Sequence, residues 1–242
     1  EEDALDTFDL AIERALTADD PGRVLALLVV VADMHSQSGN YDDALAAYER
    51  SRLLAQESAD LGALVNVLKS QGNLQQEIEA FADANETLAQ LLELQEELGD
   101  LKGQGETLSL IGANQASLGQ TGRAFATLED AVKRSLEAGA RPRALAVLGA
   151  IAAMHEEAGS SSSVASIYRR SNKVAYDLLQ DQEKANDRAG MASTLSLLGQ
   201  NHAQLGEFDI ALSSLSQAVQ LAGASGATFD ELTALRTMGD IY

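Results

Sequence analysis

The spacing of leucine and glycine along this 242-residue chain constrains its fold more than any other feature. Leu195 and Gly199 recur further along the chain as Leu235 and Gly239, a step of 40 in the numbering. Stepping back through the chain by 40, with one step of 47, gives the rest of the series: Leu28, Leu68, Leu108 and Leu148, followed four positions later by Ala32, Gly72, Gly112 and Ala152. An internal repeat of this length is typical of stacked structural units, each of which buries its apolar face against the next.

The second half of each unit keeps the same spacing. In the first full unit the turn position holds Gly39, and Ala44, Tyr48 and Ser51 follow at helical spacing. Apolar and small side chains at i, i+4 and i+7 lie on one face of a helix, and a Gly or Ala lets a neighbouring helix approach closely. Each unit is therefore predicted to be a helical hairpin whose turn residue ends the first helix in a left-handed conformation.

The composition agrees with a helical chain. Aromatic residues make up only 4% of the sequence, Trp is absent, and there are two prolines. Ala, Leu, Glu and Gln are abundant, and these residues favour helix. The composition therefore favours an all-helical protein over one whose core is built on large rings.

The pattern resembles the tetratricopeptide repeat, in a long form of about 40 residues per unit. The segments that carry the resemblance best are Leu195 through Ala218 and Gly39 through Tyr48. Glu79 replaces a turn glycine, Ser161 replaces a turn aromatic, and the Trp and closing Pro of the consensus are missing. The resemblance implies an all-α, right-handed superhelical solenoid of antiparallel helical hairpins, with about 11 helices.

The spacing predicts a single repeat domain over residues 1–242. Its parts are a half-repeat at 1–19, full repeats at about 20–59, 60–99, 100–139, 140–186 and 187–226, and a half-repeat at 227–242. The step of 47 implies a seven-residue insertion near 179–188, which we expect to lengthen one helix. Neither half-repeat has the polar cap of a solenoid terminus. We therefore expect a fragment of a longer repeat protein, or ends that are covered by other helices such as those of a second copy.

The three histidines predict no chemical site. His35, His155 and His202 occupy the same position in three different repeats. Because packed helices lie roughly 8–10 Å apart, these side chains are too distant to share a metal ion, and we interpret them as structural. The sequence has no cysteine, no calcium loop and no phosphate loop. We therefore expect no catalytic, metal or cofactor residues, and a protein that is not an enzyme.

The net charge of −20 argues against binding to nucleic acid, whose phosphates are neutralised by Lys and Arg, and against anionic membranes. Residues 1–100 carry 22 acidic against 5 basic side chains, a net of −17, which leaves −3 for residues 101–242. A basic partner would be steered toward the N-terminal half, or the acidity serves solubility or salt adaptation. No signal or transmembrane segment is visible, so we expect a cytoplasmic location.

In proteins of this kind the first helices of the hairpins line the concave face. The residues just after each Leu and each Gly or Ala are then expected to be exposed in a groove. The candidate partner-binding residues are Asp33, Asn66, Lys69, Asn73, Gln76, Ser109, Ala113, Ala153, Ser196 and Gln200. Their small and weakly polar side chains predict a smooth groove for a helix or an extended peptide.

The sequence supports one leading hypothesis and two alternatives. The leading hypothesis is a protein–protein interaction scaffold, or the regulatory or sensory repeat region of a larger protein, that binds a helix or extended peptide in this groove. The first alternative is a structural module that forms homo-oligomers through its uncapped ends. The second, an enzyme or small-ligand binder, lacks any supporting motif.

Overall fold

The computed structural model describes residues 2–242, with the side chains of residues 2–6, 9 and 225 excepted, and its secondary structure is entirely helical. The helices are α1 (Glu2–Thr17), α2 (Pro21–Gln37), α3 (Tyr41–Glu57), α4 (Leu61–Glu77), α5 (Phe81–Glu97), α6 (Leu101–Ser117), α7 (Thr121–Glu137), α8 (Arg141–Glu157), α9 (Ser161–Ala185), α10 (Arg188–Gln204), α11 (Phe208–Ser225) and α12 (Thr228–Ile241). The all-α prediction is confirmed. Residues 2–242 form twelve helices, one more than the expected number of about 11. Twelve is the number that the predicted repeats themselves contain: one helix in the first half-repeat, two in each of five hairpins and one in the last half-repeat.

The turns between helices share one backbone motif. At Gly39, where φ is +77°, the N–H of Asn40 donates to the carbonyl of His35 at 2.9 Å, and the N–H of Gly39 donates to Ser36 at 3.0 Å. These two bonds are those of the Schellman motif, which satisfies the last carbonyls of a helix. Glu79 adopts the same left-handed conformation with a φ of +60°, although it carries a side chain.

Aspartate side chains cap several of the first helices of the hairpins. Asp60 accepts a hydrogen bond from the backbone N–H of Ala63 at 2.9 Å, and Asp100 accepts one from Gly103 at the same distance. Such a cap satisfies one of the backbone donors that a helix leaves free at its N-terminus. The capping residues repeat with the period of the sequence: Asp20, Asp60, Asp100 and Asp187.

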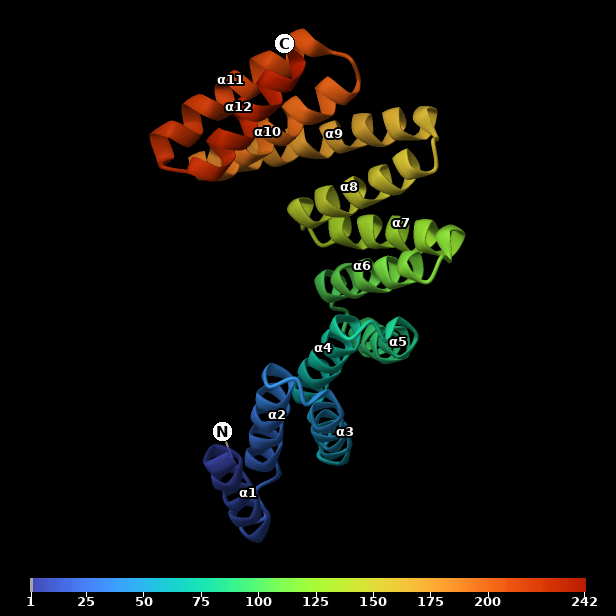
Figure 1. Ribbon diagram of the computed structural model, residues 1–242, viewed down its shortest axis with the longest axis vertical. Coiled ribbons are helices and arrows are strands. Elements are labelled where there is room, and N and C mark those ends of the chain that lie inside the picture. Colours follow the sequence, from blue (N-terminus) through green and yellow to red (C-terminus); the bar gives the residue numbers. More distant parts are fainter. Residues whose placement is uncertain (1) are drawn as a thin grey trace. The chain divides into compact units, whose positions relative to one another are not determined.

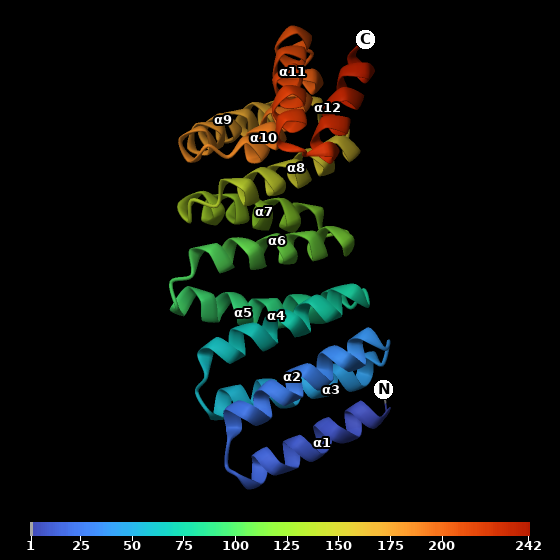
Figure 2. The same ribbon diagram turned by 90° about the vertical axis from the view of Figure 1, so that its left-hand side faces the viewer.

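The chain forms two compact units, residues up to Thr127 and residues from Leu128 onward. In the first unit, α1 to α6 pack in chain order, and α2 also contacts α4 (Figure 1, Figure 2). In the second unit, α8 to α12 pack in chain order, and α10 also contacts α12. The first helix of a hairpin therefore packs between two second helices: α4 lies between α3 and α5, and α10 lies between α9 and α11. Each also contacts the first helix of a neighbouring hairpin, α2 for α4 and α12 for α10. Helix α7 spans the boundary between the units.

Small residues allow the helices of a hairpin to pack closely, as the sequence pattern predicts. A Cβ added at Gly72 would lie 2.9 Å from Cδ2 of Leu88, and one added at Gly199 would lie 2.7 Å from Cδ2 of Leu215. Both leucines are fully buried. The glycines are therefore required by the space between α4 and α5 and between α10 and α11.

The predicted insertion lengthens α9, which has 25 residues where α8 and α10 have 17 each. Asn186 ends this helix in a left-handed conformation with a φ of +55°. Asn reaches that conformation more readily than most residues with a side chain. Among residues 2–242, no helix is both long enough and apolar enough to cross a membrane.

Candidate peptide-binding groove

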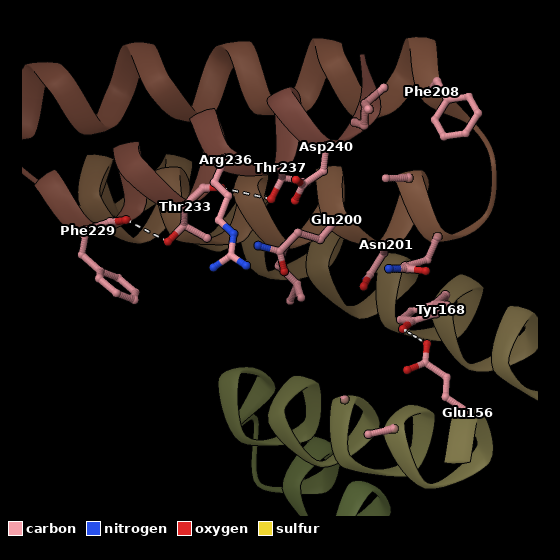
Figure 3. A pocket seen from close by; sticks show the side chains of 16 residues that line it. Glu156, Tyr168, Gln200, Asn201, Phe208, Phe229, Thr233, Arg236, Thr237 and Asp240 are labelled. Atoms are coloured by element: carbon pink, nitrogen blue, oxygen red, sulfur yellow. Dashed lines mark hydrogen bonds between the residues drawn. The ribbon is translucent and has the colours of Figure 1, made fainter. Parts of the chain in front are cut away.

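An open groove of about 710 Å³ lies in the second unit, between α8, α10 and α12. Helix α8 contributes small residues, Gly149 and Ala153, to one wall. Figure 3 shows Gln200 of α10 and Arg236 of α12 on the wall that faces α8. The groove is thus built largely from the first helices of successive hairpins, which present short side chains on one side and polar side chains on the other.

The groove combines apolar and charged groups. Phe208 and Phe229 stand at its rim with exposed fractions of 52% and 81% (Figure 3). Arg236 and Asp240 add one charge of each sign on α12. Exposed aromatic rings beside polar groups are characteristic of surfaces that bind proteins, because the rings give large contact areas at low entropic cost.

Tyr168 and Glu156 close one end of the groove. The Tyr168 hydroxyl donates a hydrogen bond of 2.6 Å to Oε1 of Glu156. The pKa of Tyr168 is raised to about 12, mainly by partial burial, and the hydrogen bond and charge of Glu156 act in the same direction. The phenol is therefore neutral at neutral pH and donates its proton to the hydrogen bond with Glu156.

Two of the three candidate binding residues in the second unit line this groove. They are Ala153, which is exposed, and Gln200, which is half-buried. Ser196 is only 4% exposed, and its hydroxyl has no hydrogen-bond partner among the described residues. The expectation that Ser196 is exposed is wrong, because α10 packs against α9, α11 and α12 and leaves this position almost no access to solvent.

The candidate residues of the first unit lie on α2, α4 and α6. Asn66, Asn73 and Ala113 are exposed. Lys69 forms an ion pair of 3.2 Å with Glu106, and the Gln76 side chain donates a hydrogen bond of 2.5 Å to Asn114. Ser109, which is half-buried, donates to the carbonyl of Gly105 in its own helix at 2.8 Å. Lys69 and Gln76 therefore join α4 to α6.

Asp33, the remaining candidate, accepts a hydrogen bond from the hydroxyl of Tyr48. Burial is the main cause that raises the pKa of Tyr48, and the hydrogen bond to Asp33 adds to it. Tyr48 also borders a hollow of about 220 Å³ together with Asn73. Asp33 is therefore hydrogen-bonded to a core tyrosine in the first hairpin, as Glu156 is to Tyr168 in the second unit.

Three solved structures illustrate what this chain is similar to. The crystal structure of BtubC (BKLC) from P. vanneervenii has a TM-score of 0.64 and 18% identity over 93% of this chain and 92% of that one. A putative kinesin light chain with nearly identical TPR-like repeats from Podosopora anserina has a TM-score of 0.56 and 15% identity over 85% and 97%. The Rap conjugation gene regulator of the plasmid pLS20, solved in complex with a Phr peptide, has a TM-score of 0.51 and 14% identity over 90% and 58%.

This chain has a tetratricopeptide-like fold. The likeness extends over most of its length and agrees with the repeat spacing. No family model matches the sequence, and comparison with characterised proteins finds no match either. At these levels of identity the likeness to the solved structures shows the fold alone.

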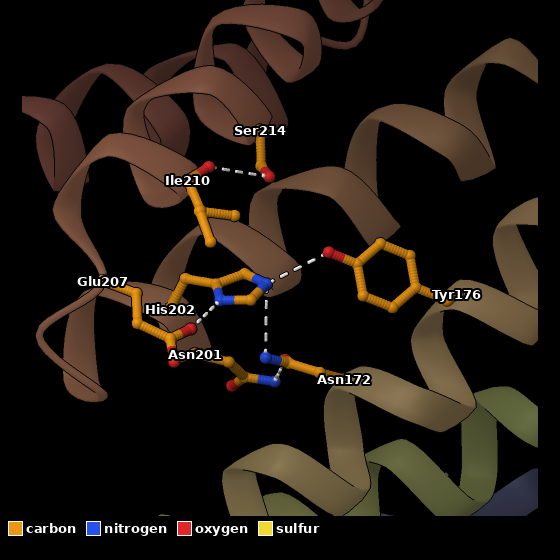
Figure 4. Close-up of polar contacts among 7 residues, drawn as sticks. All are labelled: Asn172, Tyr176, Asn201, His202, Glu207, Ile210 and Ser214. Atoms are coloured by element: carbon orange, nitrogen blue, oxygen red, sulfur yellow. Dashed lines mark hydrogen bonds and ion pairs between the residues drawn. The ribbon is translucent and has the colours of Figure 1, made fainter.

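Sequence reasoning missed a buried polar network around His202 of this tetratricopeptide-like chain. Nδ1 of His202 lies 2.5 Å from Oε2 of Glu207, and Nε2 lies 3.1 Å from the hydroxyl of Tyr176 (Figure 4). Because a carboxylate only accepts, Nδ1 is the donor in that contact. Asn201 donates hydrogen bonds of 2.8 Å to Asn172 and 3.0 Å to Ser171, and Nδ2 of Asn172 lies 3.4 Å from Nε2 of His202.

This network explains His202 without a ligand. Its partners come from α9 and from the residue that precedes α11, so it ties three consecutive helices together. The sequence signal that could have revealed it is the acidic Glu207 directly after the turn glycine Gly206. Over the part of the chain that the structure describes, no three His, Asp or Glu side chains are placed to hold a metal ion.

Proposed function

We propose that this chain is a protein-interaction scaffold that binds a peptide segment in the groove between α8, α10 and α12. The observation that carries the proposal is the groove itself, about 710 Å³ in volume, with small residues on α8 and aromatic rings at its rim. A regulatory or sensory repeat region would use the same surface. The peptide named in the structure of the Rap regulator, which shares the fold, supports this type of ligand.

The groove favours a segment with at least one bulky apolar side chain. Gly149 and Ala153 leave room for such a side chain, and Phe208 and Phe229 supply apolar surface for it. The Gln200 amide can both donate to and accept from a peptide backbone. The net charge of −20 favours basic residues elsewhere in the partner, because it raises the rate of encounter with cations.

Peptides selected from a random library against the intact chain would test this proposal. The affinity of the tightest peptide would then be measured by calorimetry for Ala153→Arg and for the matched control Ala113→Arg. Both alanines are exposed, and Ala113 lies on α6 in the first unit. We expect Ala153→Arg to weaken binding at least about tenfold, equivalent to roughly 1.4 kcal/mol, and Ala113→Arg to leave it unchanged. The reverse result would move the site to the first unit and refute the assignment.

A further inference from the structure

The side chain of Asn201 joins the buried core of the second unit to the groove. Asn201 is only 3% exposed, yet it lines the groove on the α10 wall, toward the end that Tyr168 and Glu156 close (Figure 3). Its Nδ2 donates hydrogen bonds to Asn172 and Ser171 of α9, whereas no described residue donates one to its Oδ1. Because buried polar atoms are rarely left without a partner, a donor for this oxygen has to come from the groove.

The hydrogen bonds around His202 determine which end of the Asn201 amide faces the groove (Figure 4). Nδ1 of His202 donates to Glu207, so Nε2 of the neutral ring is an acceptor. Nδ2 of Asn172 lies 3.4 Å from that nitrogen, and Oδ1 of Asn172 accepts from Nδ2 of Asn201 at 2.8 Å. Each group is thus oriented by the one before it, and Asn201, the last of them, presents an acceptor to the groove.

The first unit contains a similar amide pair whose oxygen does have a donor. Asn114 occupies the repeat position of Asn201, and its Nδ2 donates to Asn85 at 3.1 Å. Its Oδ1 accepts a hydrogen bond from the Gln76 amide at 2.5 Å. The second unit has Glu156 at the repeat position of Gln76, and an ionised carboxylate only accepts. The oxygen at this repeat position therefore binds an N–H donor in the first unit, and the described residues of the second unit supply none.

The charges around Asn201 favour a cationic donor. Glu156 is exposed and accepts from Tyr168 through Oε1, which leaves its Oε2 without a partner among the described residues. Asp240 also lines the groove. Among the described residues that line the groove, Arg236 is the only basic one, and no ion pair joins it to either carboxylate. The groove thus offers two carboxylates and an amide oxygen to a positively charged group of the ligand.

We propose that Glu156 and Asn201 together bind an arginine side chain of the peptide that occupies the groove. This assignment rests on the peptide-binding function proposed above. A guanidinium carries five N–H donors in a planar fork, so it can donate to a carboxylate and to an amide oxygen on two different helices at once. The ammonium group of lysine is instead a compact point charge that is more strongly hydrated. A basic peptide also suits the net charge of −20.

Selection from a random peptide library, run in parallel against the wild type, Glu156→Gln and Glu157→Gln, tests the proposal. Glu157 is a matched control, because it is exposed, carries the same charge and is not among the residues that line the groove. We expect arginine to be enriched at one position of the peptides selected by the wild type and by Glu157→Gln, but not of those selected by Glu156→Gln. Equal enrichment with all three proteins, or enrichment with none, would overturn the assignment.

Calorimetry with the tightest wild-type peptide measures the contact itself. Replacing the arginine by citrulline, which has a similar shape and no charge, should weaken binding to the wild type about tenfold and leave binding to Glu156→Gln nearly unchanged. Equal affinities of the two peptides for the wild type would refute the contact. Acetylation of the peptide's N-terminus should have no effect, and a loss of affinity on acetylation would assign the site to the α-ammonium group instead.

The contribution of Asn201 is measured with Asn201→Leu, because α4 has Leu74 at the same repeat position. The variant should weaken binding of the arginine peptide more than binding of the citrulline peptide. An equal loss for both peptides in a folded variant would show that the Asn201 oxygen does not contact the guanidinium. If circular dichroism shows that this variant is unfolded, Glu156→Gln and the citrulline peptide still decide the proposal.

Ala153→Arg separates this proposal from the groove assignment on which it rests. If Ala153→Arg weakens binding while citrulline and Glu156→Gln do not, the groove binds the peptide and the arginine contact is refuted. If Ala153→Arg leaves binding intact, the groove assignment is refuted and the arginine contact with it. A library that yields no peptide for the wild type would refute both.

Discussion

The substitution Gly→Ala should have opposite effects at two glycines of the second unit. Gly149 lies within α8 and Gly199 within α10, each well inside a helix of 17 residues. Around Gly149 no heavy atom lies within 4 Å of a new Cβ. At Gly199 the new Cβ would lie 2.7 Å from Cδ2 of Leu215 and 3.2 Å from the carbonyl oxygen of Ala211.

The expected magnitudes follow from helix propensity and packing. Replacing an exposed helical Gly by Ala stabilises a protein by about 0.8–1.0 kcal/mol, which is the whole effect expected for Gly149→Ala. Gly199→Ala gains the same propensity, but overpacking costs about 1–3 kcal/mol. Because the Ala211 oxygen belongs to the backbone, α11 has to move away from α10. When the gain in helix propensity is subtracted from the cost of overpacking, the free energy of unfolding of Gly199→Ala is expected to fall by up to about 2 kcal/mol.

Urea unfolding followed by circular dichroism would measure both variants. At a slope of roughly 2 kcal/mol per molar, each change of about 1 kcal/mol moves the midpoint by about 0.5 M. The Gly149→Ala midpoint should rise and the Gly199→Ala midpoint should fall. If both midpoints rise together, the space between α10 and α11 does not require a glycine, and the packing argument for the repeat position fails.

Two other predictions concern a turn and a tyrosine. Glu79 holds a φ of +60°, and a left-handed conformation costs a residue with a side chain about 1–2 kcal/mol. Glu79→Gly should therefore raise the urea midpoint by the equivalent of about 0.5–1 kcal/mol, net of the extra entropy of Gly in the unfolded chain; an unchanged or lower midpoint would contradict this. Burial and Glu156 raise the pKa of Tyr168 to about 12, above the value of about 10 in an unfolded chain. The resulting stabilisation is complete below about pH 10 and disappears as the pH rises through about 12. Melting temperatures should therefore fall less steeply over this interval in Tyr168→Phe than in the wild type, and parallel curves would show that the phenol is not coupled to folding.

The helices, their turns and their pairing could be predicted from the repeat pattern of the sequence. A hairpin is a local structure, and each of its requirements is met within a single repeat of the chain. The repeat length and the type of residue at each repeat position together predict three observed features. They are the left-handed turn at Gly39, the close approach of a neighbouring helix at Gly199 and the greater length of α9. The aspartate caps follow the same spacing and could have been predicted from it.

Which side chains are exposed enough to bind a partner depends on how the helices pack in three dimensions. Ser196 and Gln200 lie one turn apart on α10, yet Ser196 is buried and Gln200 faces the groove. Lys69 and Gln76 were both expected to be exposed; Lys69 is exposed, although it pairs with Glu106 of α6, whereas Gln76 is half-buried and hydrogen-bonded to Asn114 of α6. Repeat position fixes the direction in which a side chain leaves its own helix. Its exposure depends on the neighbouring helices and on the length of their side chains, which a period of 40 does not encode.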